Sequence, residues 1–571
     1  MAKKQAPFSQ VIQNIEDWPI YRLSEDREAF IKELDDFTLQ RILRKPTDEI
    51  SDIIAKTIYL ERIRIKEEPW KVDPPKERSF WRRIRKKLVR GSLDQEDEAE
   101  ARATNEEILR EIINRYSEEV VGTFNISTFL FARRFLTVFF NRLLNTAASR
   151  NLARIWGGKH RLYERLIVKG QLDQIRSLVT KGTVVVVPTH HSNLDSILIG
   201  FAMDAILGMP SSYYGAGLNL YNTGYTAYYM NRLGAYRVDR RKKNSIYLEV
   251  LKANSNLAIR RGTNSLFFPG GTRSRSGALE TKLKMGLLGT TVEAQRAICE
   301  RGDDGKVFIV PLILSYHFVL EAKFLIEQHL KYIGKENYIQ MQDASYSRRK
   351  ILKFIWELFA QSSDIILSFG KPLDVLGNFV DEEGRSYDRR GREVQIEDYF
   401  VSDGRVKADL QRESEYTRIL ADRIVDRYHK ENIVLSSHLV AFAVFNLLRH
   451  KNAKLDLFGL LRLPPEDYEF SFAEVVETVR QLREQLLAME KAGKIKLNEE
   501  LYWEVPRLIR NGIGHLGRYH SQKPLKITKD DKIISEDFKV LFFYHNRLEN
   551  YQLDQLIQWK SPVPVLEKET T

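Results

Sequence analysis

The chain has 571 residues, more than one hydrophobic core usually serves, so roughly two to four structural units are expected. Lysine and arginine outnumber aspartate and glutamate by 90 to 77, and the net charge of +13 favours anionic partners such as lipid headgroups, phosphorylated metabolites or nucleic acid. A single cysteine, Cys299, excludes an internal disulfide framework and a cysteine-rich metal site, and it fits a reducing compartment.

Nothing at the start of the sequence predicts secretion. MAKKQAPFSQ is not followed by the apolar core and small-residue cleavage site of a signal peptide, so we expect a location on the cytoplasmic side. No window offers about twenty uninterrupted apolar residues, the length that a helix needs to cross a bilayer.

Residues 1–120 show the apolar periodicity of amphipathic helices, and prolines at Pro46 and between Pro69 and Pro75 predict breaks. Within this region the segment 80–91, FWRRIRKKLVRG, mixes large apolar side chains with arginine and lysine. That composition suits an anionic membrane surface, and the alternative is an ordinary solvated basic helix.

The segment closest to a membrane span, residues 120–144, carries Arg133 and Arg134 at its middle. Two adjacent guanidinium groups are costly at mid-bilayer, whereas a helix in the headgroup plane keeps them wet and buries its phenylalanines. A core helix whose arginines reach the surface is the alternative.

The middle of the chain alternates helical segments with short β-branched or aromatic runs, at residues 183–188, 234–238, 265–269, 307–316 and 364–370. That alternation predicts an α/β fold with a central, mostly parallel sheet flanked by helices. Ligands collect beyond the carboxyl ends of strands in such sheets, so the residues after each run are candidate site residues.

Beyond the last run, residues 381–394 are too polar for a core and predict an exposed excursion, and the pattern becomes helical again near residue 432. We therefore predict four parts: an N-terminal helical region (1–120), a central domain with the motifs (121–375), a charged excursion with a linking helix (376–430) and a C-terminal helical region (431–571).

The first run ends on THHSNLD, in which four residues separate His190 from Asp195. A histidine at a strand end can present one ring nitrogen to a cleft while a carboxylate in the next helical turn binds the other nitrogen. The pair is a candidate general base. Ser192 and Asp195 also fit the Ser-x-x-Asp capping pattern, which would make Asp195 structural.

Two later runs end on basic loops. GAYRVDRRKK places Arg240 and Arg241 where forked donors can bind phosphate oxygens, and its alternative is an exposed basic loop. FFPGGTRSRSG has an anion-binding composition that is not a P-loop. Its candidate ligands are Gly271, Arg273, Ser274 and Arg275. The fourth run ends near Tyr316 and Glu321, and we interpret it as a buried strand with an ordinary exit.

In chain order HHSNLD, GAYRVDR, FPGGTRS and IVPLIL closely resemble the four sequence blocks of the glycerolipid acyltransferase family, over roughly residues 124–330. RSRSG, the later Lys284-Met285-Gly286 and the long helical flanks are most similar to its bacterial glycerol-3-phosphate acyltransferase branch. Two departures stand out. Gly270 replaces the glutamate of the third block, and Asp239 stands where that branch usually has arginine.

The resemblance implies that His190, oriented by Asp195, takes the proton of the sn-1 hydroxyl of glycerol 3-phosphate as that oxygen attacks the thioester of acyl-CoA or an acyl carrier protein. The residues expected to bind substrate are Arg240, Gly271, Arg273, Ser274, Arg275 and Lys284. Neither metal nor cofactor is implied beside the acyl donor. The product, lysophosphatidic acid, belongs to phospholipid synthesis, so we expect peripheral or monotopic attachment to an anionic surface on the cytoplasmic side of the inner membrane.

Two alternatives stay open. Acylation of lysophosphatidic acid at its sn-2 hydroxyl uses the same pair, with Asp239 as its best support. A non-catalytic lipid-binding or acyl-carrier-binding relative fits Gly270 but not the intact His190 and Asp195. Nucleic acid is not an expected partner, because the sequence has no RNA-recognition, zinc-finger or helix-turn-helix signature.

Overall fold

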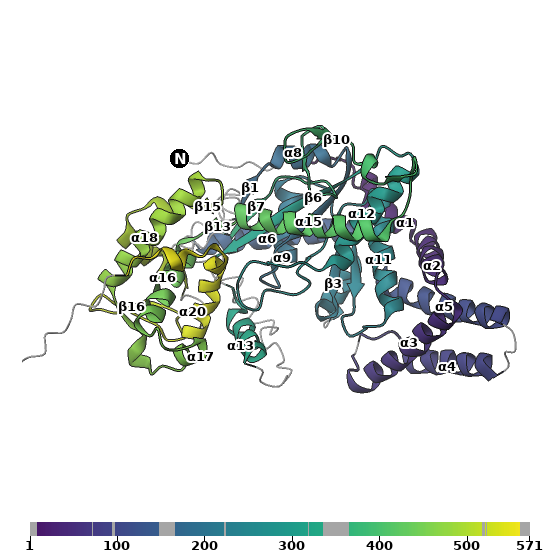
Figure 1. Ribbon diagram of the computed structural model, residues 1–571, viewed down its shortest axis with the longest axis horizontal. Helices are drawn as coiled ribbons and strands as arrows, with labels where there is room; N and C mark the ends of the chain where they lie inside the picture. The colour runs from purple at the N-terminus through teal and green to yellow at the C-terminus, as the bar shows by residue number, and fades with distance from the viewer. Residues whose placement is uncertain are drawn as a thin grey trace, which may run out of the picture.

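The computed structural model describes residues 8–70, 72–93, 98–147, 166–221, 224–317, 319–334, 365–516, 520 and 522–559. Figure 1 shows N-terminal helices at one end, a twisted sheet in the middle and a second group of helices at the other end. The predicted α/β fold, with a mostly parallel sheet between helical regions, is confirmed.

The central sheet has the strand order β1-β7-β6-β2-β5-β3-β4. Its strands are β1 (Leu166–Gly170), β2 (Gly182–Pro188), β3 (Tyr213–Gly217), β4 (Ala235–Val238), β5 (Ser265–Leu266), β6 (Lys306–Tyr316) and β7 (Ile365–Phe369). Neighbours from β6 to β4 are parallel, as are β1 and β7, whereas β6 and β7 are antiparallel. The valines of β2 are completely buried, as expected for a central strand covered on both faces.

Helices follow most of these strands and pack on the sheet. They are α8 (Leu172–Leu178), α9 (Asp195–Phe201), α10 (Gly224–Met230), α11 (Ser245–Arg260), α12 (Met285–Glu300), α13 (Ala322–Ile333) and α15 (Leu410–Glu431). Between β7 and α15 lie the short strands β8 (Phe379–Val380), β9 (Ser386–Tyr387), β10 (Glu393–Val394), β11 (Val401–Ser402) and β12 (Arg405–Val406). Helix α15 contacts both α12 and β6, so the chain returns to the sheet after this polar excursion.

The N-terminal helices are α1 (Pro19–Glu25), α2 (Arg27–Leu43), α3 (Thr47–Glu67), α4 (Glu77–Leu93) and α5 (Glu98–Val120). Pro46 directly precedes α3, and the later prolines lie between α3 and α4, so both predicted breaks are confirmed. In α4, Trp81 and Ile84 are buried, and the Trp81 ring lies 6.0 Å from that of Tyr116 on α5. The apolar side of this basic helix therefore packs inward, and its solvent side is cationic.

Helix α6 (Ile126–Ala147) follows, and it has two different sides. Phe129 is buried, and Arg133 forms an ion pair with Asp204 in which its Nε lies 2.7 Å from Oδ2. On the other side Leu130, Phe131, Phe135 and Val138 are exposed, and we call these four residues the α6 apolar band. Among the residues that the structure describes, no helix combines the length and apolar content of a bilayer span.

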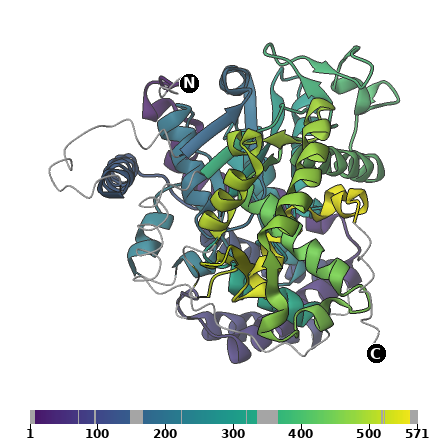
Figure 2. The same ribbon diagram turned by 90° about the vertical axis from the view of Figure 1, so that its left-hand side faces the viewer.

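The C-terminal region faces the viewer in Figure 2. It contains β13 (Ile433–Val434), α16 (Ser436–Lys451), α17 (Leu457–Leu460), β14 (Glu469–Ser471), α18 (Phe472–Lys491), β15 (Lys496–Leu497), α19 (Val505–Leu516), β16 (Lys526–Ile527), β17 (Lys532–Ile534) and α20 (Phe538–His545). Helix α16 is buried from Ser436 to Leu448, because α18, α19 and α20 all contact it. Its core continues into the core on one side of the central sheet.

Candidate active site

The loop between β2 and α9 folds around one carboxylate. Asp195 is completely buried, and its Oδ2 lies 2.8 Å from Nδ1 of His190. The same oxygen accepts the backbone N–H of His191 at 2.7 Å and of Ser192 at 2.9 Å. Of the Ser-x-x-Asp capping pattern only the bond from the Ser192 N–H to Asp195 forms, because Ser192 Oγ accepts the Leu194 N–H and not that of Asp195. Asp195 therefore both organises the loop and holds the imidazole.

Tyr316, at the end of β6, supplies a further donor to this carboxylate. Strand β6 runs four residues beyond Leu312, the partner of the last β2 residue, and so reaches over the loop. Its Tyr316 hydroxyl donates to Asp195 Oδ1 at 2.6 Å. Burial, together with the negative charge of Asp195, raises the pKa of Tyr316 well above its usual value, so the hydroxyl stays protonated.

Because every other partner of Asp195 is a donor, we assign His190 the tautomer with hydrogen on Nδ1, which leaves Nε2 able to accept a proton. The His190 side chain is 16% exposed. Its ring stacks on Phe268 with centroids 4.1 Å apart, a contact that limits its rotation. The arrangement is that of a general base held in one orientation and open to a small ligand.

The neighbouring His191 is not an equivalent base. It is buried, and its Nε2 lies 2.7 Å from Nη1 of Arg547, which follows α20. Burial and the positive charge of Arg547 hold the pKa of His191 well below its usual value. The guanidinium is buried too, and it also donates to the Leu314 carbonyl at 2.8 Å and to Asn432 Oδ1 at 3.0 Å.

The loop of the third block lies directly against His190 and Asp195, the pair that we call the dyad. The Ser274 N–H donates to the His190 carbonyl at 2.7 Å, while the Ser274 hydroxyl donates to the Ala278 carbonyl at 2.8 Å. Gly271 has a φ of +78°, and an added Cβ there would lie only 2.7 Å from Cδ of Lys284. The glycine thus lets the exposed Lys284, at the start of α12, lie across the loop.

Arg273 is joined to the dyad loop through Glu321. Its Nη1 lies 3.4 Å from Glu321 Oε1, and its side chain is 15% exposed. Glu321 also accepts the Ser192 hydroxyl at 3.1 Å and the Asn193 N–H at 3.0 Å. Arg273 is therefore linked through Glu321 to the loop that carries His190, and its role as a phosphate ligand stays a prediction.

The other basic candidates lie farther away. Arg240 is exposed after β4, three strands from β2, which corresponds to about 14 Å at the usual strand spacing. Its neighbour Arg241 binds Asp239 through two bonds of 2.9 and 2.7 Å, so the unusual Asp239 anchors an arginine. Arg275 lies near α13, where the burial of His329 and, after it, the positive charge of Arg275 lower the pKa of His329.

The C-terminal region also contacts the third-block loop. Gly277 has a φ of +87°, and an added Cβ would lie 2.1 Å from the carbonyl oxygen of Phe543 on α20. Asn546 Nδ2 donates to the Ser276 carbonyl at 2.9 Å. The third-block loop and the loop after β2 are thus both held by residues more than 250 positions later in the chain.

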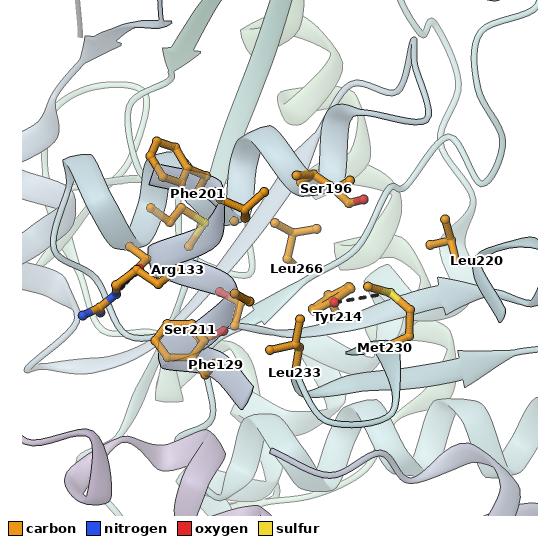
Figure 3. A pocket seen from close by; sticks show the side chains of 17 residues that line it. Phe129, Arg133, Ser196, Phe201, Ser211, Tyr214, Leu220, Met230, Leu233 and Leu266 are labelled. Atoms are coloured by element: carbon orange, nitrogen blue, oxygen red, sulfur yellow. Dashed lines mark hydrogen bonds and ion pairs between the residues drawn. The ribbon is translucent and has the colours of Figure 1, made fainter. Parts of the chain in front are cut away.

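A mostly apolar cavity of about 210 Å³ lies beside α9, between α6, α10 and β3. Its lining includes Ser196 and Ile197, which directly follow Asp195. In Figure 3 Tyr214, Leu233 and Leu266 lie around the cavity and the Arg133 guanidinium points outward. The buried side of α6 lines this cavity, and the other side of the same helix carries the α6 apolar band.

Some of these residues are not among the predicted site residues. Tyr316 ends the fourth run and Glu321 follows it, so the only sequence signal for them is the strand end, whose interpretation as an ordinary exit misses both. Arg547 and Glu280 have no local signal, because only the fold brings them to the dyad.

A family model described as "Acyltransferase" matches residues 167–315. The chain is 27% identical over 295 residues to a glycerol-3-phosphate acyltransferase of Shewanella amazonensis, covering 50% of this chain and 31% of that protein. With the glycerol-3-phosphate acyltransferase of Shewanella woodyi the identity is 25% over 467 residues, 78% of this chain and 50% of that protein. The chain thus spans about a third to a half of the length of these curated relatives. Residues 167–315 therefore match an acyltransferase domain, and the chain is similar to glycerol-3-phosphate acyltransferases around it.

Proposed function

We propose that this chain is an acyltransferase that moves a fatty acyl group from acyl-CoA or an acyl carrier protein to the sn-1 hydroxyl of glycerol 3-phosphate. The observation that carries the proposal is the His190 Nδ1 to Asp195 Oδ2 contact of 2.8 Å at the end of the central strand β2. The names of the curated relatives support the acceptor.

In this reaction Nε2 of His190 takes the hydroxyl proton as the oxygen forms a bond to the thioester carbonyl carbon. The resulting imidazolium is stabilised by the buried Asp195 carboxylate. Collapse of the tetrahedral intermediate breaks the carbon–sulfur bond, and the leaving thiolate takes the proton from His190. A well-placed base contributes about 10² to 10⁴ in rate, and no covalent enzyme intermediate is needed.

The acceptor's phosphate would bind on the third-block side of His190. Arg273 is held there by Glu321, and Lys284 lies across Gly271. Charge-assisted bonds from both side chains suit a phosphate dianion. Arg240 would act as a more distant cationic residue at the same edge of the sheet.

The acyl chain would occupy the apolar cavity beside α9. Ser196 and Ile197, the two residues after Asp195, line this cavity, and α6 lies between it and the α6 apolar band. A peripheral helix of this kind can rest in the headgroup layer of a membrane, so chain and product need not cross water. Arg134, which is exposed beside the band, would face anionic headgroups.

The test is an assay of the purified protein with palmitoyl-CoA and either glycerol 3-phosphate or lysophosphatidic acid, with identification of the acylated product. We expect lysophosphatidic acid from glycerol 3-phosphate, and His190→Ala should abolish its formation without lowering the melting temperature. Acylation of lysophosphatidic acid alone would show that the acceptor is wrong. Normal turnover by His190→Ala would show that the base is wrong.

A further inference from the structure

Glu280 brings a second carboxyl group to the dyad loop. It follows the third block in sequence, and its Oε1 accepts the backbone N–H of His190 at 3.0 Å. This contact fixes the main chain of the residue whose side chain carries the proposed proton transfer.

The same carboxyl group lies over Gly270. A Cβ added to Gly270 would be 3.2 Å from Glu280 Cγ and 3.3 Å from Oε1, closer than most side-chain contacts. The space that a side chain at position 270 would enter is therefore occupied by the carboxyl group of Glu280. Gly270 is also the position at which this sequence lacks the third-block glutamate.

The other oxygen of Glu280 is unusual. Oε2 is buried and has no hydrogen-bond partner within the described part of the chain. Burial raises the pKa of Glu280 to about 7, although the His190 N–H and the positive charge of Arg547 act in the opposite direction. A buried carboxyl group with one oxygen unbonded is costly to the fold, so its presence calls for an explanation.

We propose that Glu280 is the positioning residue for His190 and that it supplies, from ten residues further along the chain, the carboxyl group absent at Gly270. The two positions form a matched pair, since the glycine leaves the space that the Glu280 side chain fills. By binding the His190 N–H, Glu280 fixes the main chain of His190, and this keeps the imidazole in contact with Asp195 and Phe268. This inference rests on the proposed function, because it assigns Glu280 a role in acyl transfer.

Four proteins test it: the wild type, Glu280→Met, Glu280→Gln and the double variant Gly270→Glu with Glu280→Ala. Glu280→Met keeps the side-chain volume and removes only the acceptor, so it should fold. Because a backbone N–H beside the dyad loses its partner, we expect kcat to fall roughly ten- to hundredfold. The KM for glycerol 3-phosphate should stay within about twofold, since Arg273 and Lys284 are untouched.

The two other variants separate positioning from simple packing. Glu280→Gln retains an oxygen that can accept the His190 N–H, so its kcat should stay within about tenfold of wild type. The double variant restores a carboxyl group from position 270, and its kcat should exceed that of Glu280→Met at least tenfold. A normal kcat for Glu280→Met, or a folded double variant no better than it, would overturn the proposal.

Hydrogen exchange of the peptide containing His190 gives a readout that does not need activity. Glu280→Met should lower the protection of the His190 N–H at least tenfold, and the double variant should restore it. If the wild type acylates neither acceptor, the proposed function fails, and the exchange result still decides whether Glu280 positions His190. Unchanged protection in Glu280→Met would refute the positioning role.

Discussion

Asp195→Asn removes the negative charge of the dyad and keeps its hydrogen-bond geometry. The asparagine oxygen can occupy the Oδ2 place, where it accepts from His190, His191 and Ser192 as before. The amide nitrogen then faces the Tyr316 hydroxyl, which can turn and accept a hydrogen bond. The loop should keep its shape, and what is lost is the negative charge that stabilises the imidazolium.

The size of this loss follows from Coulomb's law. Two unit charges about 4 Å apart at an effective dielectric constant of about 20 attract by about 4 kcal/mol. Each 1.36 kcal/mol of barrier corresponds to about tenfold in rate, so kcat should fall about a thousandfold. The KM for glycerol 3-phosphate should change little, because Asp195 is completely buried and would not touch the phosphate.

The assay follows thiol release from palmitoyl-CoA at saturating glycerol 3-phosphate. Asp374→Asn is a matched control, because Asp374 is also completely buried and accepts backbone N–H groups, at 2.8 and 2.9 Å, in the loop after β7. Its kcat should stay within about twofold of wild type. A loss of less than about tenfold in Asp195→Asn, with the fold intact, would refute the electrostatic role of the carboxylate.

Three further predictions concern the phosphate site, the C-terminal contact and the membrane face. Arg273→Ala should raise the KM for glycerol 3-phosphate at least about tenfold. Arg241→Ala is the control and should leave this KM unchanged, because the Arg241 guanidinium is bound by Asp239; an equal rise in both variants would remove Arg273 from the site. Arg547→Met should lower the free energy of unfolding by about 3–5 kcal/mol in denaturant titrations, because the buried His191 ring and Leu314 carbonyl lose their hydrogen-bond donor. A change under about 1 kcal/mol would contradict this role. Phe131→Asp with Phe135→Asp should reduce co-sedimentation with phosphatidylglycerol vesicles while thiol release from a short-chain acyl-CoA persists, and unchanged sedimentation would exclude the α6 apolar band as the membrane contact.

The sequence predicts the parts of the site that depend on local spacing. His190 and Asp195 meet because five positions carry the chain around one turn between β2 and α9, and the valine run before them reads clearly as a buried strand. The glycine-rich third block is similarly local. Strand β3 was not predicted, because YYGAG contains two glycines, which weaken any strand signal.

The rest depends on packing that one sequence does not reveal. GAYRVDRRKK offers adjacent arginines, and only the fold shows that Arg241 turns back to Asp239 while Arg240 stays at the surface. In the same way FWRRIRKKLVRG has a composition that suits an anionic membrane surface, and only the fold shows that Trp81 on its apolar side packs on Tyr116. The sequence shows that Gly270 departs from the third block, but only the fold shows that the Glu280 side chain lies next to it.

The near-contact of Gly277 with Phe543 bears on how the chain can be divided into fragments. No side chain fits between these backbones, and Arg547 lies against His191 a few residues later. A fragment that ends before α20 would lose the Phe543 backbone beside the third-block loop and the Arg547 partner of His191. Helix α20 and the residues after it therefore form part of the wall around the candidate site, and fragment designs or domain fusions have to include them.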